Sequence, residues 1–92
     1  MHKAIAHNRG DHVAVAVAEI APDEEIVVVY LDDDGEERIR ATAAVPYGHK
    51  VAVRPLSADE PVIEYSTQVG VARTSIGAGD YVHVHNIKTA RW

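Results

Sequence analysis

The sequence alternates between short aliphatic runs and turn residues, a pattern that predicts a chain of short β-strands with little helix. Valine alternates with alanine over residues 13–17, and this period of two is typical of a strand. Residues 26–31 are bulky enough for a strand buried on both faces. Asp34 and Gly35 suit a hairpin turn, from which residues 37–42 return as a strand. Shorter strands are predicted at residues 51–54, 62–65 and 81–85, and Gly70 interrupts the segment between the last two.

Three segments, residues 20–26, 56–62 and 76–82, share a simple pattern. Each has an aliphatic residue, a tight turn that carries an acid, and a second aliphatic residue where a strand begins. The segments start 36 and then 20 residues apart (20, 56, 76), so the chain is not a regular solenoid. We interpret them as ordinary turns between strands, which favours a compact, mainly β domain.

Composition limits the size of the core and the kind of partner. The 92 residues give room for one domain, residues 1–92, and a core rich in Val and Ala without Phe is thin. A partner chain, or a second copy of this one, is expected to complete it. A net charge of -5 argues against binding to nucleic acid.

Targeting signals are not apparent in the sequence. The chain has no cysteine, which excludes disulfides and thiolate chemistry and fits a reducing cytoplasm. The first residues lack the apolar region of a signal peptide, and no apolar run reaches the length of a membrane span. A cytoplasmic location without membrane association is therefore expected.

The stretch Tyr-Val-His-Val-His-Asn at residues 81–86 concentrates polar chemistry near the end of the sequence. In an extended strand, side chains two apart share a face, so His83 and His85 would project together. Imidazoles ligate Zn, Fe, Ni or Cu, but two ligands do not complete a metal site. The candidates for further donors are His49, His12, Asp11 and Asn86. The alternative is that both histidines belong to the half-exposed polar face of a strand.

His49 and Lys50 follow Gly48 in a turn, where the backbone can approach a ligand. An imidazole can act as acid or base near neutral pH, and a neighbouring lysine can bind an anionic substrate. The same pair could equally belong to an ordinary surface loop. Asp11 is a further polar candidate, with the alternative that it accepts backbone hydrogen bonds at the entry to a strand.

Four pieces of the sequence, in a fixed order, resemble a known family. They are Gly10-Asp11-His12-Val13-Ala14, then Pro46-Tyr47-Gly48-His49-Lys50-Val51-Ala52, then Val62-Ile63-Glu64-Tyr65 with Val69-Gly70-Val71-Ala72, and finally Gly79-Asp80-Tyr81-Val82-His83-Val84-His85-Asn86. Together they resemble the SAF domain of altronate and galactarate dehydratases over nearly the whole chain. The chain is similar to the free-standing small subunit of that family, a form also found in sulfolactate sulfo-lyases. It departs from the family at His12, where asparagine is usual.

The resemblance implies a β-clip fold and a lyase that removes water or sulfite from a hydroxy acid. It also implies a divalent metal such as Fe²⁺, held mainly by a large catalytic subunit. Elimination beside a carboxylate needs a base, stabilisation of the developing negative charge and help for the leaving group. We expect the catalytic residues to be His49, His83 and His85, and the substrate-binding residues to be Lys50, Asn86 and Asp11; His83 and His85 are also the candidate metal ligands.

Three functions remain open on the sequence alone. As a small lyase subunit, the chain would expose an apolar patch at residues 69–76 and Trp92 for its large partner. As a stand-alone SAF-type module, it would bind a small acidic sugar without turning it over. As an interaction domain, it would carry its histidines incidentally. Fold alone does not choose among these functions, because function depends on the site.

Overall fold

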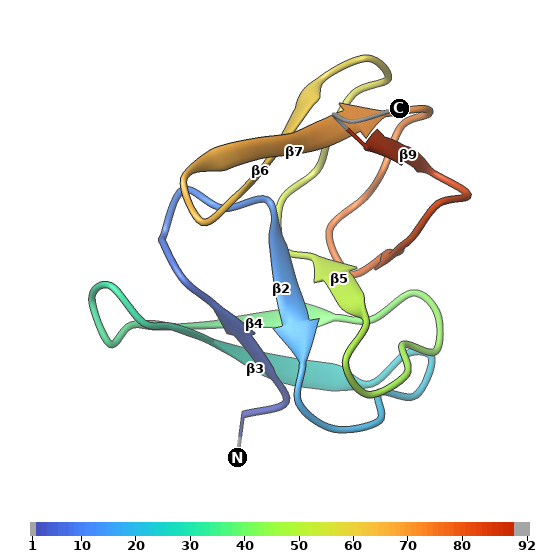
Figure 1. Cartoon of the computed structure of the whole chain (residues 1–92). Helices are drawn as coiled ribbons and strands as arrows, with labels where there is room; N and C mark the ends of the chain where they lie inside the picture. Colours follow the sequence, from blue (N-terminus) through green and yellow to red (C-terminus); the bar gives the residue numbers. More distant parts are fainter. Residues whose placement is uncertain (1, 90–92) are drawn as a thin grey trace.

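Residues 2–89, the part of the chain that the computed structural model describes, form nine short β-strands and no helix (Figure 1). The strands are β1 (Ala4–Ala6), β2 (Val13–Ala16), β3 (Glu25–Tyr30), β4 (Glu36–Arg40), β5 (Lys50–Ala52), β6 (Pro61–Glu64), β7 (Thr67–Ala72), β8 (Tyr81–Val82) and β9 (Ile87–Thr89). The mainly β fold predicted from the sequence is confirmed. Among these residues there is also no helix long and apolar enough to cross a membrane.

The strands form two sheets and two small cores, and the second core contains residues of both sheets. The larger sheet has the order β4-β3-β1-β2-β5-β8, with β1 and β3 parallel, and the smaller has the order β6-β7-β9. Figure 1 shows β6, β7 and β9 together at one end of the molecule and β3 and β4 at the other. At the start of β2, the N–H of His12 donates to the carbonyl of Ile63 in β6 at 2.8 Å, which joins the two sheets.

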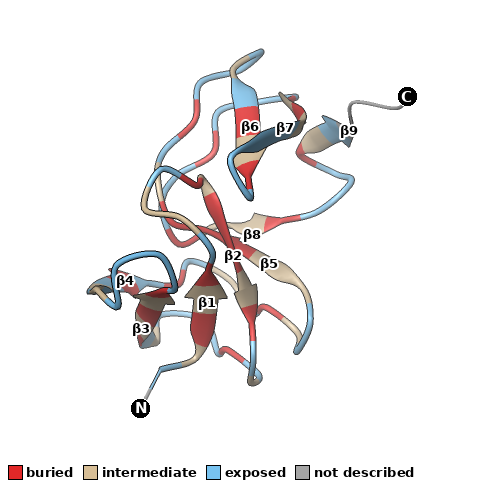
Figure 2. Ribbon diagram, turned by 60° about the vertical axis from the view of Figure 1, so that its left-hand side comes forward, coloured by how far each residue is buried: buried red, intermediate tan, exposed pale blue. Residues whose placement is uncertain are grey.

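Small side chains allow the strands to approach each other closely in both cores. Buried positions alternate along β3, where Ile26, Val28 and Tyr30 face inward while Val27 and Val29 are half-buried. Figure 2 shows buried residues concentrated along β1, β2 and β5. The prediction that β3 is buried on both faces is therefore wrong, because its second face is only partly covered.

Four turns of one design shape the chain; we call them the docking turns. They are residues 20–26, 45–51, 56–62 and 76–82. The fourth residue of each has a positive φ: Asp23, Gly48, Asp59 and Gly79. Its N–H donates to the carbonyl of a buried alanine, and the N–H of that alanine donates back to the next carbonyl of the turn. The alanines are, in the same order, Ala41, Ala16, Ala72 and Ala52.

The docking turns work in two reciprocal pairs, because each turn binds the alanine that precedes its partner turn. Ile20 forms a β-bridge with Val45, and Leu56 forms one with Ile76. The sequence pattern grouped three of these turns together. A turn was also predicted at residues 46–50, but it was not grouped with the others because it has no acid. Replacing one of these four alanines with a larger residue would push the docking turn away, since the backbone of the turn lies in direct contact with the alanine.

Three strands were not predicted, and part of one expected surface is buried. β1 and β9 are only three residues long, and β7 contains Gly70, which lies in the middle strand of its sheet opposite Val62 and Thr89. The apolar patch predicted at residues 69–76 is wrong for Ile76, which is buried in the second core. Trp92, the other part of that prediction, lies outside the described residues.

Candidate active site

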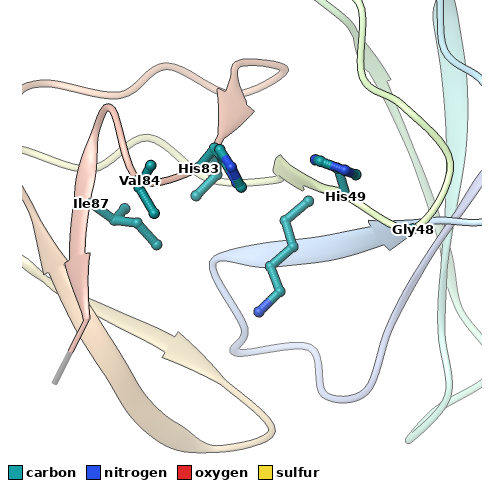
Figure 3. A pocket seen from close by; sticks show the side chains of 7 residues that line it. Gly48, His49, His83, Val84 and Ile87 are labelled. Carbon is teal, nitrogen blue, oxygen red and sulfur yellow. The ribbon is translucent and has the colours of Figure 1, made fainter. Parts of the chain in front are cut away.

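A surface pocket of about 330 Å³ lies between the start of β5 and the loop that joins β8 to β9. It is lined by Gly48, His49, Lys50, Val82, His83, Val84 and Ile87. Figure 3 shows Ile87 and Val84 at one end, His49 at the other end, and His83 between them. Since an apolar end and an imidazole-rich end share one concavity, the pocket suits a small molecule with polar groups.

The docking turn at 45–51 explains why His49 is available for chemistry. In the other three docking turns the fifth residue is Glu24, Glu60 or Asp80, whose carboxylate accepts the N–H of the second residue. In turn 45–51 the second residue is Pro46, which has no N–H to satisfy. The side chain of the fifth residue, His49, is therefore not needed to accept a hydrogen bond from the second residue. Its backbone remains fixed, because its N–H donates to the carbonyl of Pro46 and its carbonyl accepts from Ala16.

Tyr81 contacts all three histidines that the sequence singled out, although it was not among the predicted site residues. Its hydroxyl lies 2.6 Å from Nδ1 of His49. Its ring stacks on His83 with an angle of 7° between the planes, and its centroid lies 5.6 Å from that of His85. The signal was present in the sequence, because Tyr81 precedes His83 and His85 at the spacing of a strand face.

The predicted strand 81–85 is wrong beyond Val82, where the chain turns toward β9. The carbonyl of His83 accepts the N–H groups of Asn86 and Ile87, both at 3.1 Å, so residues 83–86 form a turn. His83 and His85 are both exposed in that turn, and only His83 lines the pocket. The two imidazoles therefore do not project from one strand face as the sequence suggested.

Asn86 is buried and its side chain is committed to the turn that it closes. Oδ1 accepts the N–H of His83 at 3.0 Å, and Nδ2 donates to the carbonyl of Tyr81 at 2.8 Å. Both ends of the amide are thus used within the protein. The geometry gives Asn86 the task of fixing the loop that carries His83 and His85, and its predicted contact with substrate stays a prediction.

Lys50 lines the pocket, but its ammonium group already has a partner. Nζ lies 2.5 Å from Oε1 of Glu64, a buried residue at the end of β6. The pair connects β5 of the larger sheet to β6 of the smaller sheet. The side chain of Lys50 keeps 38% of its surface exposed, so it can contact a ligand while it stays paired with Glu64.

Asp11 does not line the pocket and lies fully buried at the junction of the two sheets. Its carboxylate accepts the backbone N–H groups of Asn8, Tyr65 and Ser66. Tyr65 and Ser66 both have positive φ, so Asp11 secures a hairpin turn that these side chains would not favour unaided. This is the alternative that the sequence analysis gave for Asp11. Its predicted role in substrate binding stays a prediction.

His12, the departure from the family pattern, also has a local explanation. Nδ1 accepts the N–H of Ile63 at 2.9 Å, next to the backbone bond from His12 to the carbonyl of the same residue. The Oδ1 atom of an asparagine is an acceptor at a similar distance from the backbone. His12 can therefore make the hydrogen bond that an asparagine would make.

The pocket is lined by nitrogen donors and by no carboxylate of its own, although the chain as a whole is acidic. Its lining includes His49, Lys50 and His83, whereas the whole chain carries a net charge of -5. The charge of Lys50 is balanced by Glu64, so these groups would hold an anion mainly through hydrogen bonds. The arrangement can bind a small acid, and an imidazole beside it can move a proton.

Residues 2–89 do not supply a complete metal site of their own. Within this range, no three His, Asp or Glu side chains come close enough together to hold an ion. The donor set therefore does not fit a divalent metal bound by this chain alone. The predicted Fe²⁺, and a ligand role for His83 or His85, stay predictions.

Fold and site together define a small β domain that presents a histidine-lined pocket at its surface. Residues 2–90 match the altronate/galactarate dehydratase SAF domain, and the chain belongs to that family. It is 39% identical over 89 residues to the (2R)-sulfolactate sulfo-lyase subunit alpha of Chromohalobacter salexigens, a match that covers 96% of this chain and 95% of the relative.

Two further relatives show the same domain in different settings. The (2R)-sulfolactate sulfo-lyase subunit alpha of Paracoccus pantotrophus is 39% identical over 67 residues, which cover 73% of this chain and all of the relative. The altronate dehydratase of Bacillus subtilis is 26% identical over 89 residues, which cover 97% of this chain but only 17% of that enzyme. The domain thus occurs both as a subunit and within a longer enzyme.

Proposed function

We propose that this chain is the small subunit of a two-subunit lyase that acts on a small hydroxy acid. The observation that carries the proposal is the 39% identity to a sulfo-lyase subunit alpha along 95% of that subunit. The pocket supports it independently, because the imidazoles and the ammonium group in its lining can donate hydrogen bonds to a hydroxy acid, which is an anion at neutral pH. The large partner subunit would cover the open pocket and complete the site.

Among hydroxy acids, (2R)-sulfolactate is the first candidate substrate. Two relatives named for it are each 39% identical to this chain, against 26% for the altronate dehydratase. Sulfite would then be the leaving group. Altronate or galactarate, with water as the leaving group, is the alternative that the same family offers.

The elimination reaction needs a base and groups that bind negative charge, and the pocket contains both. A base takes the proton from the carbon that carries the hydroxyl group, and the electron pair forms a double bond as sulfite leaves the next carbon. The resulting enol loses its hydroxyl proton and gains a proton on carbon, and so becomes a 2-keto acid. His49 or His83 would take the proton or support the negative charge that develops on the carboxylate, and Lys50 would bind an acidic group of the substrate. A divalent metal, if used, would be held mainly by the partner.

Co-expression with a large subunit tests this proposal. The chain is produced alone and together with a candidate large subunit encoded in the same genome, and both preparations are assayed with sulfolactate, altronate and galactarate in the presence of Fe²⁺. We expect turnover only in the pair. His49→Gln should lower kcat about 10²-fold or more, whereas the control His7→Gln, outside the pocket, should leave it unchanged.

The other outcomes have distinct meanings. Turnover of altronate but not sulfolactate would keep the lyase and change its substrate. A chain that forms no pair, shows no turnover and binds a sugar acid by itself would overturn the proposal in favour of a stand-alone binding module. Sulfite and the 2-keto acid are both measured, so keto acid formed with or without an equal amount of sulfite determines the leaving group in the same assay.

A further inference from the structure

Tyr81 is held in place by strand pairing, by a hydrogen bond and by packing against the core. It lies in β8 opposite Val51 of β5, and its carbonyl accepts Nδ2 of the buried Asn86. Its ring packs partly buried against the larger core. The rings of His49, His83 and His85 lie around it at centroid distances of 5.7, 5.6 and 5.6 Å. Tyr81 is therefore a fixed point against which the three imidazoles are arranged.

The chemistry of the two groups favours one direction for the hydrogen bond between Tyr81 and His49. The distance from Oη to Nδ1 is 2.6 Å. A phenol O–H is a stronger acid than the N–H of a neutral imidazole and therefore a stronger hydrogen-bond donor, and the unprotonated imidazole nitrogen is a good acceptor. In the neutral pair, Oη–H is therefore the donor and Nδ1 the acceptor.

The direction of this bond determines where His49 carries its proton. A neutral imidazole has one N–H, and the other nitrogen is an acceptor. When Nδ1 accepts from Tyr81, the single proton lies on Nε2. His49 then offers a hydrogen-bond donor, and no lone pair, through Nε2.

We propose that Tyr81 is a positioning residue that holds His49 as a neutral Nε2–H donor toward the pocket. This inference rests on the proposed function, in which negative charge develops on the substrate carboxylate as its neighbouring carbon loses a proton. A donor fixed in advance stabilises that charge without reorganising during the reaction. His49 would thus act as the electrophilic group of the site.

The same arrangement leaves proton removal to His83. Among residues 2–89, its ring makes no hydrogen bond, and it lies 5.3 Å from the ring of His49 between centroids. Stacking on Tyr81 orients the imidazole without occupying either nitrogen. One tyrosine thus divides two similar side chains into a donor and a base, a separation achieved by surroundings rather than by residue type.

Nitrogen-15 NMR of the full-length chain, with labelled histidine, tests the tautomer directly. In the unaltered chain at pH 8, the His49 signals should show a protonated Nε2 and an accepting Nδ1. In Tyr81→Phe, the Nδ1 signal should move toward that of a nitrogen without a hydrogen bond, and the fraction with a proton on Nδ1 should rise. His49→Gln identifies the signals by their loss.

A matched control separates the hydroxyl group from the ring. Tyr65 lies against His7 with ring centroids 4.0 Å apart, outside the pocket, so Tyr65→Phe should leave the signals of His49 unchanged. A proton on Nδ1 of His49 in the unaltered chain would overturn the proposal. Identical His49 signals in Tyr81→Phe and the unaltered chain would also overturn it.

Kinetics of the assembled enzyme supply the second measurement. Tyr81→Phe should lower kcat about tenfold with KM unchanged, since the donor acts on charge that is present only during reaction; removing a donor outright costs about 10²–10³-fold. Unchanged kcat would contradict the inference. If no pairing and no turnover are found while the NMR result holds, the proposed function fails and the placement of the proton on Nε2 by Tyr81 stands.

Discussion

The clusters around Asp11 and around His49 are both polar, but the two side chains differ in their hydrogen-bond partners. Asp11 is buried, and its carboxylate accepts three backbone N–H groups. His49 lies at a pocket, and within residues 2–89 its ring is hydrogen-bonded to the hydroxyl of Tyr81 alone. A side chain whose bonds all go to the backbone holds the fold together. One that is free of such bonds and faces a pocket is available for chemistry.

The largest effect expected from this comparison is the loss of the Asp11 carboxylate. Asp11→Ala would leave three backbone N–H groups without their acceptor at the junction of the sheets, and an unsatisfied buried donor costs about 1–3 kcal/mol. We expect the free energy of unfolding in urea to fall by about 3 kcal/mol or more. Asp11→Asn, which keeps one acceptor oxygen, should lose less. Equal losses in the two variants would contradict the assignment.

The next effect in size concerns His12, where one hydrogen bond is at stake. His12→Ala removes the acceptor for the N–H of Ile63 and should cost about 1–2 kcal/mol in the free energy of unfolding. His12→Asn should cost less, because its Oδ1 can accept the same bond. Urea unfolding of the two variants measures both costs. If His12→Asn costs as much as His12→Ala, Oδ1 of asparagine does not replace Nδ1 as the acceptor.

The strands and the docking turns show which parts of the fold could be predicted from the sequence and which could not. The turn residues and the period of two were enough to predict a mainly β chain and most of its strands. Three of the four docking turns were recognised as one pattern because each carries an acid. The turn at 45–51 was predicted as a turn but not as one of this pattern, because Pro46 removes the need for that acid and His49 replaces it. The feature that hid the pattern in this turn is the feature that frees the histidine.

The site was predictable in its residue types and less so in its geometry. His49, Lys50 and His83 meet at one pocket as expected. The orientation of His83 and His85 could not be predicted, since the turn depends on both ends of the Asn86 amide. The pairing of Lys50 with Glu64 joins residues of different sheets. Contacts between segments distant in sequence leave no mark in local periodicity.

A smaller effect on stability is expected when the pH is lowered, because Glu24 in the docking turn 20–26 becomes protonated. The N–H of Ala21 and then the ammonium of Lys3 lower the pKa of Glu24 below its ordinary value of 4.5. A lowered pKa means that the contribution to stability is complete above the ordinary value and is lost as the pH falls through the folded-state value. The urea midpoint should therefore decrease below about pH 4.5. In Glu24→Gln the decrease should be shallower, and an identical pH profile would contradict this.

The smallest effect on stability is expected where the effect on activity should be largest. His49→Gln removes a ring from an open pocket in which water can replace the hydrogen bond to Tyr81, so the free energy of unfolding should change by no more than about 0.5 kcal/mol. Chemical unfolding measures the change, with Asp11→Asn as the contrasting variant. A loss near that of Asp11→Ala would mean that His49 supports the fold in the same way as Asp11. Stability close to that of the unaltered chain, together with a large loss of kcat in the assembled enzyme, would mean that His49 serves the reaction while Asp11 supports the fold.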